Sequence, residues 1–188
     1  MSIVTIKTLL WTAALCVLAA VSVIDLRRRV IPNEAAAFIA ASGLALSLFS
    51  RPGETWIGVA ISVGLLLVLA ALSHLALLGG GDAKLIAAVS LLVPPQSVAP
   101  LLLGIALAGG LLSIFYLAMR RWLPAPARRR ERSAPRHRYG AFMRFLRNER
   151  ARVFASRSVP YALAIFAGVL AYVLSELPQC SSETHCLL

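Results

Sequence analysis

The chain has 188 residues, of which 59% are hydrophobic and only 14% are charged, and its net charge is +11. Ordinary soluble domains are about 45–50% apolar, so this composition excludes a typical soluble enzyme or binding domain. A transmembrane helix needs about 20 mostly apolar residues, and the chain holds several such runs. We therefore predict an all-α, polytopic membrane protein that forms one membrane-embedded domain over residues 1–188.

Six apolar runs follow one another and predict about six transmembrane helices. They cover residues 4–24, 35–49, 56–78, 83–95, 97–119 and 159–177. The first run lacks a basic leader segment and a clear cleavage site, so we expect a retained helix rather than a signal peptide. The fourth run allows two paths. Either Pro94 and Pro95 lie inside a longer bent helix, or the run is a half-span buried against its neighbours.

Basic residues predict the orientation of these spans. They gather in three loops, at Arg27–Arg29 after the first span, at Lys84 after the third, and at thirteen arginines from Arg120 to Arg157. The loops on the other face carry only Arg51. The positive-inside rule therefore places loops 25–34, 79–84 and 120–158 in the cytoplasm and both termini outside.

The basic loop at 120–158 has two parts. Residues 120–138 are rich in Arg, Pro and Ala, a composition typical of disorder. Between Tyr139 and Phe154, apolar residues recur at helical spacing among arginines, which predicts an interfacial helix on anionic lipids. Nucleic-acid binding is the alternative for an arginine-rich run. Because this loop is tethered to a membrane, we expect lipid contact or plain anchoring of the topology, and no nucleic-acid partner.

Cysteine placement agrees with this topology. Cys180 and Cys186 lie in the outward C-terminal tail, where they either form a disulfide or stay free. The chain has no CxxC pair, so we do not expect a structural zinc site built on cysteines.

The chain has only two aspartates, and the topology places them at similar depth on the cytoplasmic side. Asp25 ends the first span, and Asp82 lies at the end of the third span or the start of the fourth. A carboxylate at membrane depth is costly and indicates a functional site, so two at one depth suggest a pair. The structural alternative is that Asp25 pairs with Arg28 or Arg29, and that Asp82 caps a helix beginning at Ala83.

The neighbours of both aspartates favour the functional interpretation. Gly79, Gly80 and Gly81 leave no side chain beside Asp82, so another backbone or an extended peptide can approach closely. In the "IPN" segment, Pro32 restricts the chain before the second span and Asn33 can cap that span. Lys84 either steers a substrate or anchors the topology. Ser22, Ser73 and Ser113 are expected to bond to backbone within their spans, and no Ser/His/Asp triad is apparent.

Three motifs in order resemble a known family. The "GGGD" from Gly79 to Asp82 matches the G-x-G-D motif of intramembrane aspartyl proteases. The "DLRRRVIPN" from Asp25 to Asn33 resembles the first-aspartate segment of type IV prepilin peptidases, and "VPYALAIFAG", with Pro160 and Tyr161, resembles that family's Pro-Tyr segment. The chain is similar to the short, peptidase-only members that serve tight-adherence (Flp) pili. It lacks the CxxC region associated with N-methylation, so methyltransferase activity is not expected.

The resemblance implies a membrane aspartic endopeptidase that needs no metal or cofactor. It would remove the short basic leader from prepilins or pseudopilins at the cytoplasmic face of the bacterial inner membrane. Asp25 and Asp82 would be the catalytic pair. The residues that shape the site would be Gly79, Gly81, Lys84, Pro32, Asn33, Pro160 and Tyr161. The alternatives are a transporter or channel that uses the two aspartates as a proton or cation relay, and a membrane scaffold.

Hydrolysis by two carboxylates needs one ionised and one protonated group. Asp25 is predicted at a helix C-terminus, where the helix dipole disfavours ionisation. Asp82 is predicted at a helix N-terminus, which favours ionisation. The sequence-based hypothesis is therefore that Asp82 is more often the anion.

Overall fold

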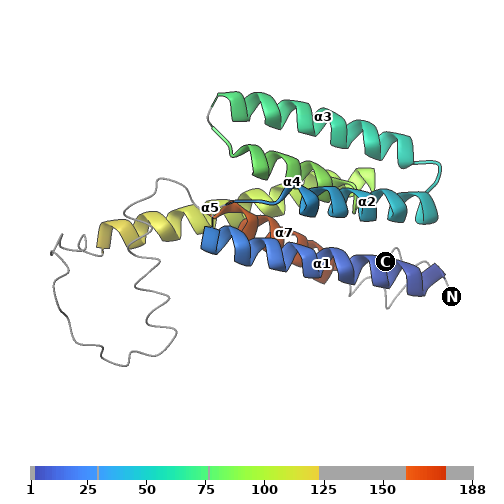
Figure 1. The fold of residues 1–188 in the computed structure, drawn as a ribbon, viewed down its shortest axis with the longest axis horizontal. Coiled ribbons are helices and arrows are strands. Elements are labelled where there is room, and N and C mark those ends of the chain that lie inside the picture. The colour runs from blue at the N-terminus through green and yellow to red at the C-terminus, as the bar shows by residue number, and fades with distance from the viewer. Residues whose placement is uncertain (1–2, 29, 76, 123–159, 177–188) are drawn as a thin grey trace. The chain divides into compact units, whose positions relative to one another are not determined.

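The computed structural model describes residues 3–28, 30–75, 77–122 and 160–176 (Figure 1). The chain divides into two compact units, one of residues 1–109 and 160–188 and the other of residues 110–159. The interfacial helix and lipid contacts expected in the basic loop, and the cysteine pair in the C-terminal tail, lie outside the described residues. They remain predictions, as does the single domain over the whole chain.

Every regular element in the described ranges is a helix, in agreement with the predicted all-α membrane class. The helices are α1 (Ile3–Arg28), α2 (Asn33–Ser50), α3 (Thr55–His74), α4 (Gly80–Ser90), the 3₁₀ turn η1 (Pro95–Ser97), α5 (Val98–Trp122) and α7 (Tyr161–Glu176). Four of these segments are long and apolar enough to cross a membrane: Thr5–Arg28, Asn33–Ser50, Thr55–His74 and Pro95–Ala118. The shorter α7 is also apolar.

The fourth predicted span takes the second of its two paths, because α4 is only 11 residues long. The helix ends at Ser90, and Pro94 has an extended backbone with φ −60° and ψ 152°. Pro94 and Pro95 therefore do not lie inside a long bent helix. At about 1.5 Å per residue, α4 is too short to cross the apolar core of a bilayer, which is about 30 Å thick.

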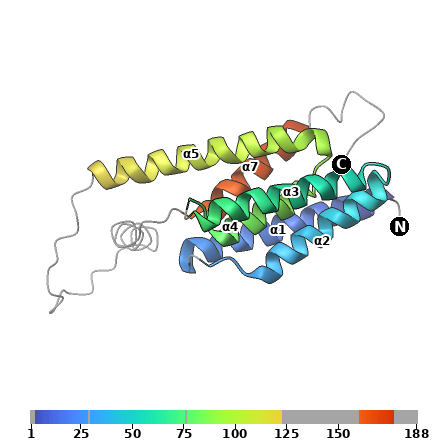
Figure 2. The same cartoon turned by 90° about the horizontal axis from the view of Figure 1, so that it is seen from above.

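The short α4 is the centre of the first unit. It packs against α2, α3 and α7, while α1 packs against α2 and α7 (Figures 1 and 2). Seven of its eleven residues are buried, and Leu85 and Val89 are fully enclosed. The Ser62 hydroxyl of α3 donates a hydrogen bond of 2.7 Å to the carbonyl oxygen of Ala87. An apolar short helix can lie at membrane depth because its neighbours cover it.

Two glycines allow helices of this unit to pack at backbone distance. A Cβ placed on Gly43 of α2 would lie 2.7 Å from Cβ of Leu91 and 2.8 Å from its backbone carbon. A Cβ on Gly168 of α7 would lie 2.7 Å from the backbone nitrogen of Ile105 in α5. The helix contacts that hold α4 and α7 in place therefore depend on the absence of side chains at these positions.

Candidate active site

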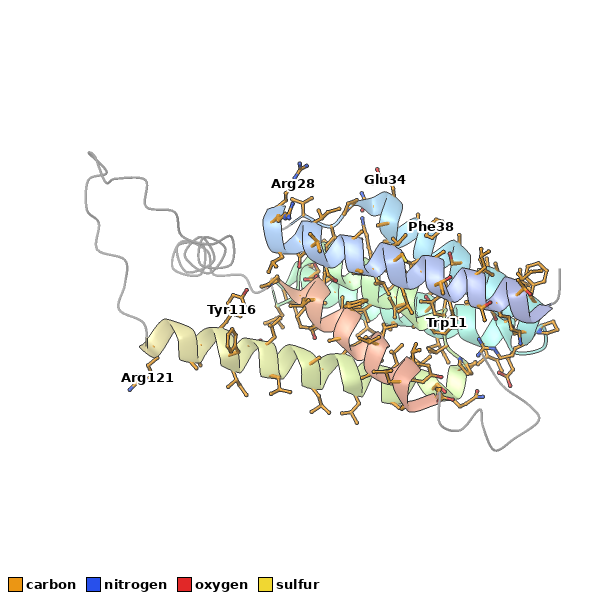
Figure 3. The ribbon with its side chains drawn as sticks, turned by 90° about the horizontal axis from the view of Figure 1, so that it is seen from below. Trp11, Arg28, Glu34, Phe38, Tyr116 and Arg121 are labelled. Atoms are coloured by element: carbon orange, nitrogen blue, oxygen red, sulfur yellow. The ribbon has the colours of Figure 1, made fainter. Side chains whose placement is uncertain are left out.

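Asp25 lies one helical turn before the end of α1 and is almost completely buried, with 6% of its surface exposed. Arg28, at the end of α1, and Glu34, in the first turn of α2, are exposed. Both point away from the same end of the helices, whereas Trp11 lies towards the other end of α1 (Figure 3). The polar end of α1 thus carries one acid that faces inward, beside charged side chains that face outward.

The Asp25 side chain meets the first turn of α7. The backbone N–H of Ala162 donates a hydrogen bond of 3.1 Å to Oδ2 of Asp25. Ala162 is the second residue of α7, where backbone N–H groups have no partner within the helix. Pro160, which precedes the helix, has no side-chain oxygen to cap it. Asp25 supplies that acceptor from a different helix.

Asp82 lies in the first turn of α4, and the structural alternative, in which it caps a helix beginning at Ala83, is wrong. The helix begins at Gly80, three residues before Ala83, so Asp82 is inside it. Gly79 is the N-cap, and among the described residues no side-chain hydrogen bond caps α4. A glycine N-cap costs a helix only a few tenths of a kcal/mol relative to a capping side chain. The carboxyl group of Asp82 is therefore left for another role.

Burial, assisted by the negative charge of Asp25, raises the pKa of Asp82 from 3.8 to about 6. Asp82 therefore binds a proton more readily than an ordinary aspartate. The raised pKa argues against the helix-dipole reasoning behind the sequence-based hypothesis that Asp82 is more often the anion. Which of the two acids carries the charge stays a prediction. The dipole of α4 does favour ionisation, but partial burial and a second carboxylate outweigh it. Asp25, in contrast, has the N-terminus of α7 against its carboxylate.

The glycines before Asp82 have distinct structural roles. A Cβ on Gly79 would lie 2.6 Å from Oδ2 of Asp82, so only glycine leaves the carboxyl group in its place. A Cβ on Gly81 would lie 3.1 Å from Cβ of Ile31, in the segment that joins α1 to α2. At Gly80 the nearest atom would be Oγ of Ser73, at an ordinary 3.4 Å. The two outer glycines thus leave room for the carboxyl group of Asp82 at Gly79 and for the side chain of Ile31 at Gly81.

Lys84 and Asn33 join α4 to the start of α2. Nζ of Lys84 donates a hydrogen bond of 3.1 Å to Oδ1 of Asn33, and both residues are exposed. The expectation that Asn33 caps α2 is wrong, because Pro32 is the N-cap and Asn33 is the first helical residue. Pro32 has the extended backbone expected of a residue before a helix, with φ −64° and ψ 135°.

The Pro-Tyr segment lies beside the two acids. Pro160 is fully buried, and Tyr161 is the first residue of α7. The ring of Tyr161 covers Gly109 of α5, where an added Cβ would lie 2.7 Å from Cε2. Its hydroxyl is within electrostatic reach of Asp82. Tyr161 therefore borders the pair on the side of α7.

Two contacts at this site were not predicted from the sequence, whereas the expected bond of Ser22 to backbone within its own span is confirmed. Ala162 contributes only its backbone N–H and carbonyl oxygen, which leave no trace in the sequence. Ser22 is buried and donates from Oγ to the carbonyl oxygens of Leu18, at 2.8 Å, and of Ala162, at 3.1 Å. Its spacing of three residues from Asp25 places both side chains on one face of α1, and this spacing is the one signal that could have identified it.

A model of the type IV leader peptidase family matches residues 12–114, which is more than half of the chain. The matched range holds Asp25, Asp82 and the glycines before Asp82, whereas Pro160 and Tyr161 lie beyond it. No curated protein matches the chain, and neither does any solved structure.

Proposed function

Because the chain belongs to the type IV leader peptidase family and is a membrane protein, we propose that it is an aspartic endopeptidase with Asp25 and Asp82 as its catalytic pair. Its substrates would be type IV prepilins or pseudopilins, from which it removes the short basic leader. The absence of a CxxC pair from the sequence supports a peptidase without N-methyltransferase activity.

One observation carries the proposal: two carboxyl groups lie within electrostatic reach of each other in unlike environments. Asp25 is buried against the backbone N–H of Ala162, and Asp82 is half-buried with a raised pKa. Two such groups share a proton and titrate as a pair. In the reactive form, Asp25 would carry the negative charge and Asp82 the proton, which Asp82 retains to a higher pH than an ordinary aspartate does.

The roles in hydrolysis follow from this asymmetry. Ionised Asp25 takes a proton from water as the water oxygen attacks the carbonyl carbon of the scissile peptide bond. Protonated Asp82 donates a hydrogen bond to the carbonyl oxygen, on which negative charge develops. Gly79 is exposed and carries no side chain, so an extended peptide can approach Asp82 from that side.

Charge placement supports a site at the cytoplasmic face of the bacterial inner membrane. Exposed Arg27, Arg28 and Lys84 lie at the helix ends that carry the two acids. By the positive-inside rule this end faces the cytoplasm, with both termini outside. The arginines of the basic loop would bind anionic lipids on the same side. A proton or cation relay would instead favour acids near the middle of the membrane.

The test is to co-express the full chain with a candidate prepilin and to follow the mass of the pilin. We expect Asp25→Asn and Asp82→Asn each to abolish removal of the leader. The matched control is Glu34→Gln, which neutralises an exposed acid at the same end and should leave processing intact. Membrane levels of each variant are measured by immunoblot. Processing that survives both aspartate changes would refute the catalytic pair.

A further inference from the structure

Ser22 is linked to the N-terminus of α7 by its hydroxyl group. Its side chain is 4% exposed and lies on α1, one turn before Asp25. Oγ is 2.8 Å from the carbonyl oxygen of Leu18 and 3.1 Å from that of Ala162. The hydroxyl has one proton, so it is shared between these two acceptors. Ser42, another buried serine, bonds within its own helix, to the carbonyl oxygen of Phe38 at 2.9 Å.

Ala162 is therefore bound to α1 through both of its backbone polar groups. Its carbonyl oxygen accepts from Ser22, and its N–H donates to Asp25. Two hydrogen bonds from one helix face fix both the distance and the rotation of the first turn of α7 relative to Asp25. With only one bond, this first turn could shift or rotate about the remaining contact.

We propose that Ser22 is a positioning residue that holds the N-terminus of α7 against the Asp25 carboxylate. The inference rests on the proposed function, since it assigns Ser22 a role in keeping the catalytic base ionised. Ser22 does not touch the reacting atoms. It acts through the backbone of Ala162, whose N–H is the donor to Asp25.

Changing Ser22 removes no charged or titratable group from this end of the helices. Those groups are Arg27 and Arg28 on α1, Glu34 on α2, Asp82 and Lys84 on α4, and Tyr161 on α7. Serine itself carries no charge. A change in the pH dependence of a Ser22 variant would therefore report the altered contact between Asp25 and the first turn of α7, rather than a lost charge.

The test is the pH profile of kcat/KM for purified full-length enzyme acting on a prepilin substrate. For Ser22→Ala we expect the acidic limb to move up by about half a pH unit or more, because a weakened hydrogen bond disfavours the ionised base. At pH values on that limb, kcat/KM should fall about 3–10-fold. Ser42→Ala is the matched control, and its acidic limb should stay in place, because Ser42 bonds within α2.

Ser22→Thr keeps the hydroxyl group and should keep the wild-type acidic limb. It also provides the readout if the alanine variant does not accumulate in the membrane, since a shifted limb in the threonine variant would contradict the proposal. A Ser22→Ala profile that is lowered equally at all pH values, or is unchanged, would likewise overturn it. Survival of processing in Asp25→Asn and Asp82→Asn would refute the proposed function instead, which separates the two failures.

Discussion

Asp25 and Ala162 are 137 residues apart in the chain and are joined by a hydrogen bond of 3.1 Å. The contact links α1, which the family model matches in part, to α7, which lies beyond the matched range. In the proposed mechanism it determines which carboxylate is the base. The helix α7 thus contributes to the site through the position of its N-terminus.

The raised pKa of Asp82 predicts a pH-dependent effect of Asp82→Asn on stability. A folded-state pKa of about 6, above the ordinary 3.8, means that ionisation of Asp82 destabilises the fold. The contribution of protonated Asp82 to the stability of the fold is complete below about pH 4 and is lost as the pH rises through about 6. Because asparagine stays neutral, we expect the variant to have a Tm a few degrees above wild type at about pH 8 and an equal Tm at about pH 4.

Thermal unfolding of the two proteins in detergent at several pH values measures this difference. Glu34→Gln, which changes an exposed acid at the same end, should follow the wild-type curve at each pH. A difference between wild type and Asp82→Asn that stays constant from acidic to alkaline pH would contradict burial of the Asp82 carboxylate as its cause.

Gly79→Ala is expected to lower peptidase activity without unfolding the protein. Its Cβ would lie 2.6 Å from Oδ2 of Asp82, so the carboxyl group must move. The backbone at Gly79, with φ −71°, accepts alanine without strain. Because small displacements of catalytic groups are costly, kcat/KM should fall about 10–100-fold.

Gly80→Ala is the matched control for that change, since its Cβ would make only an ordinary contact of 3.4 Å with Ser73. Its kcat/KM should stay within about twofold of wild type, because alanine favours a helical first turn. Equal losses of activity in the two variants would mean that helix formation, rather than the position of Asp82, explains the effect.

Gly43→Ala is expected to destabilise the protein by about 1–3 kcal/mol, because its Cβ would overlap the backbone and Cβ of Leu91. Gly64→Ala in α3 is the control, since a Cβ there would meet no described atom within 4 Å. That variant should be unchanged or slightly more stable, because alanine favours a helix by up to about 1 kcal/mol. Thermal unfolding in detergent compares them, and equal effects would refute close packing of α2 on this segment.

Much of the fold follows from sequence alone. Long apolar runs can satisfy their backbone groups in a membrane only as helices, which predicts α1, α2, α3 and α5. The length of α4 could not be fixed, because the apolar composition of residues 83–95 does not reveal where a helix ends. The structure ends it at Ser90, where packing against α2, α3 and α7 covers a half-span.

The two acids and the glycines beside Asp82 could be identified as candidate site residues from the sequence, since charges are rare and costly in an apolar chain. The environment of each carboxyl group was decided by tertiary structure. Helix dipoles are readable from local sequence, but the burial of Asp82 and the N–H of Ala162 against Asp25 are not. Every residue except proline carries that same N–H group, so only the packing of α7 on α1 determines which one meets Asp25.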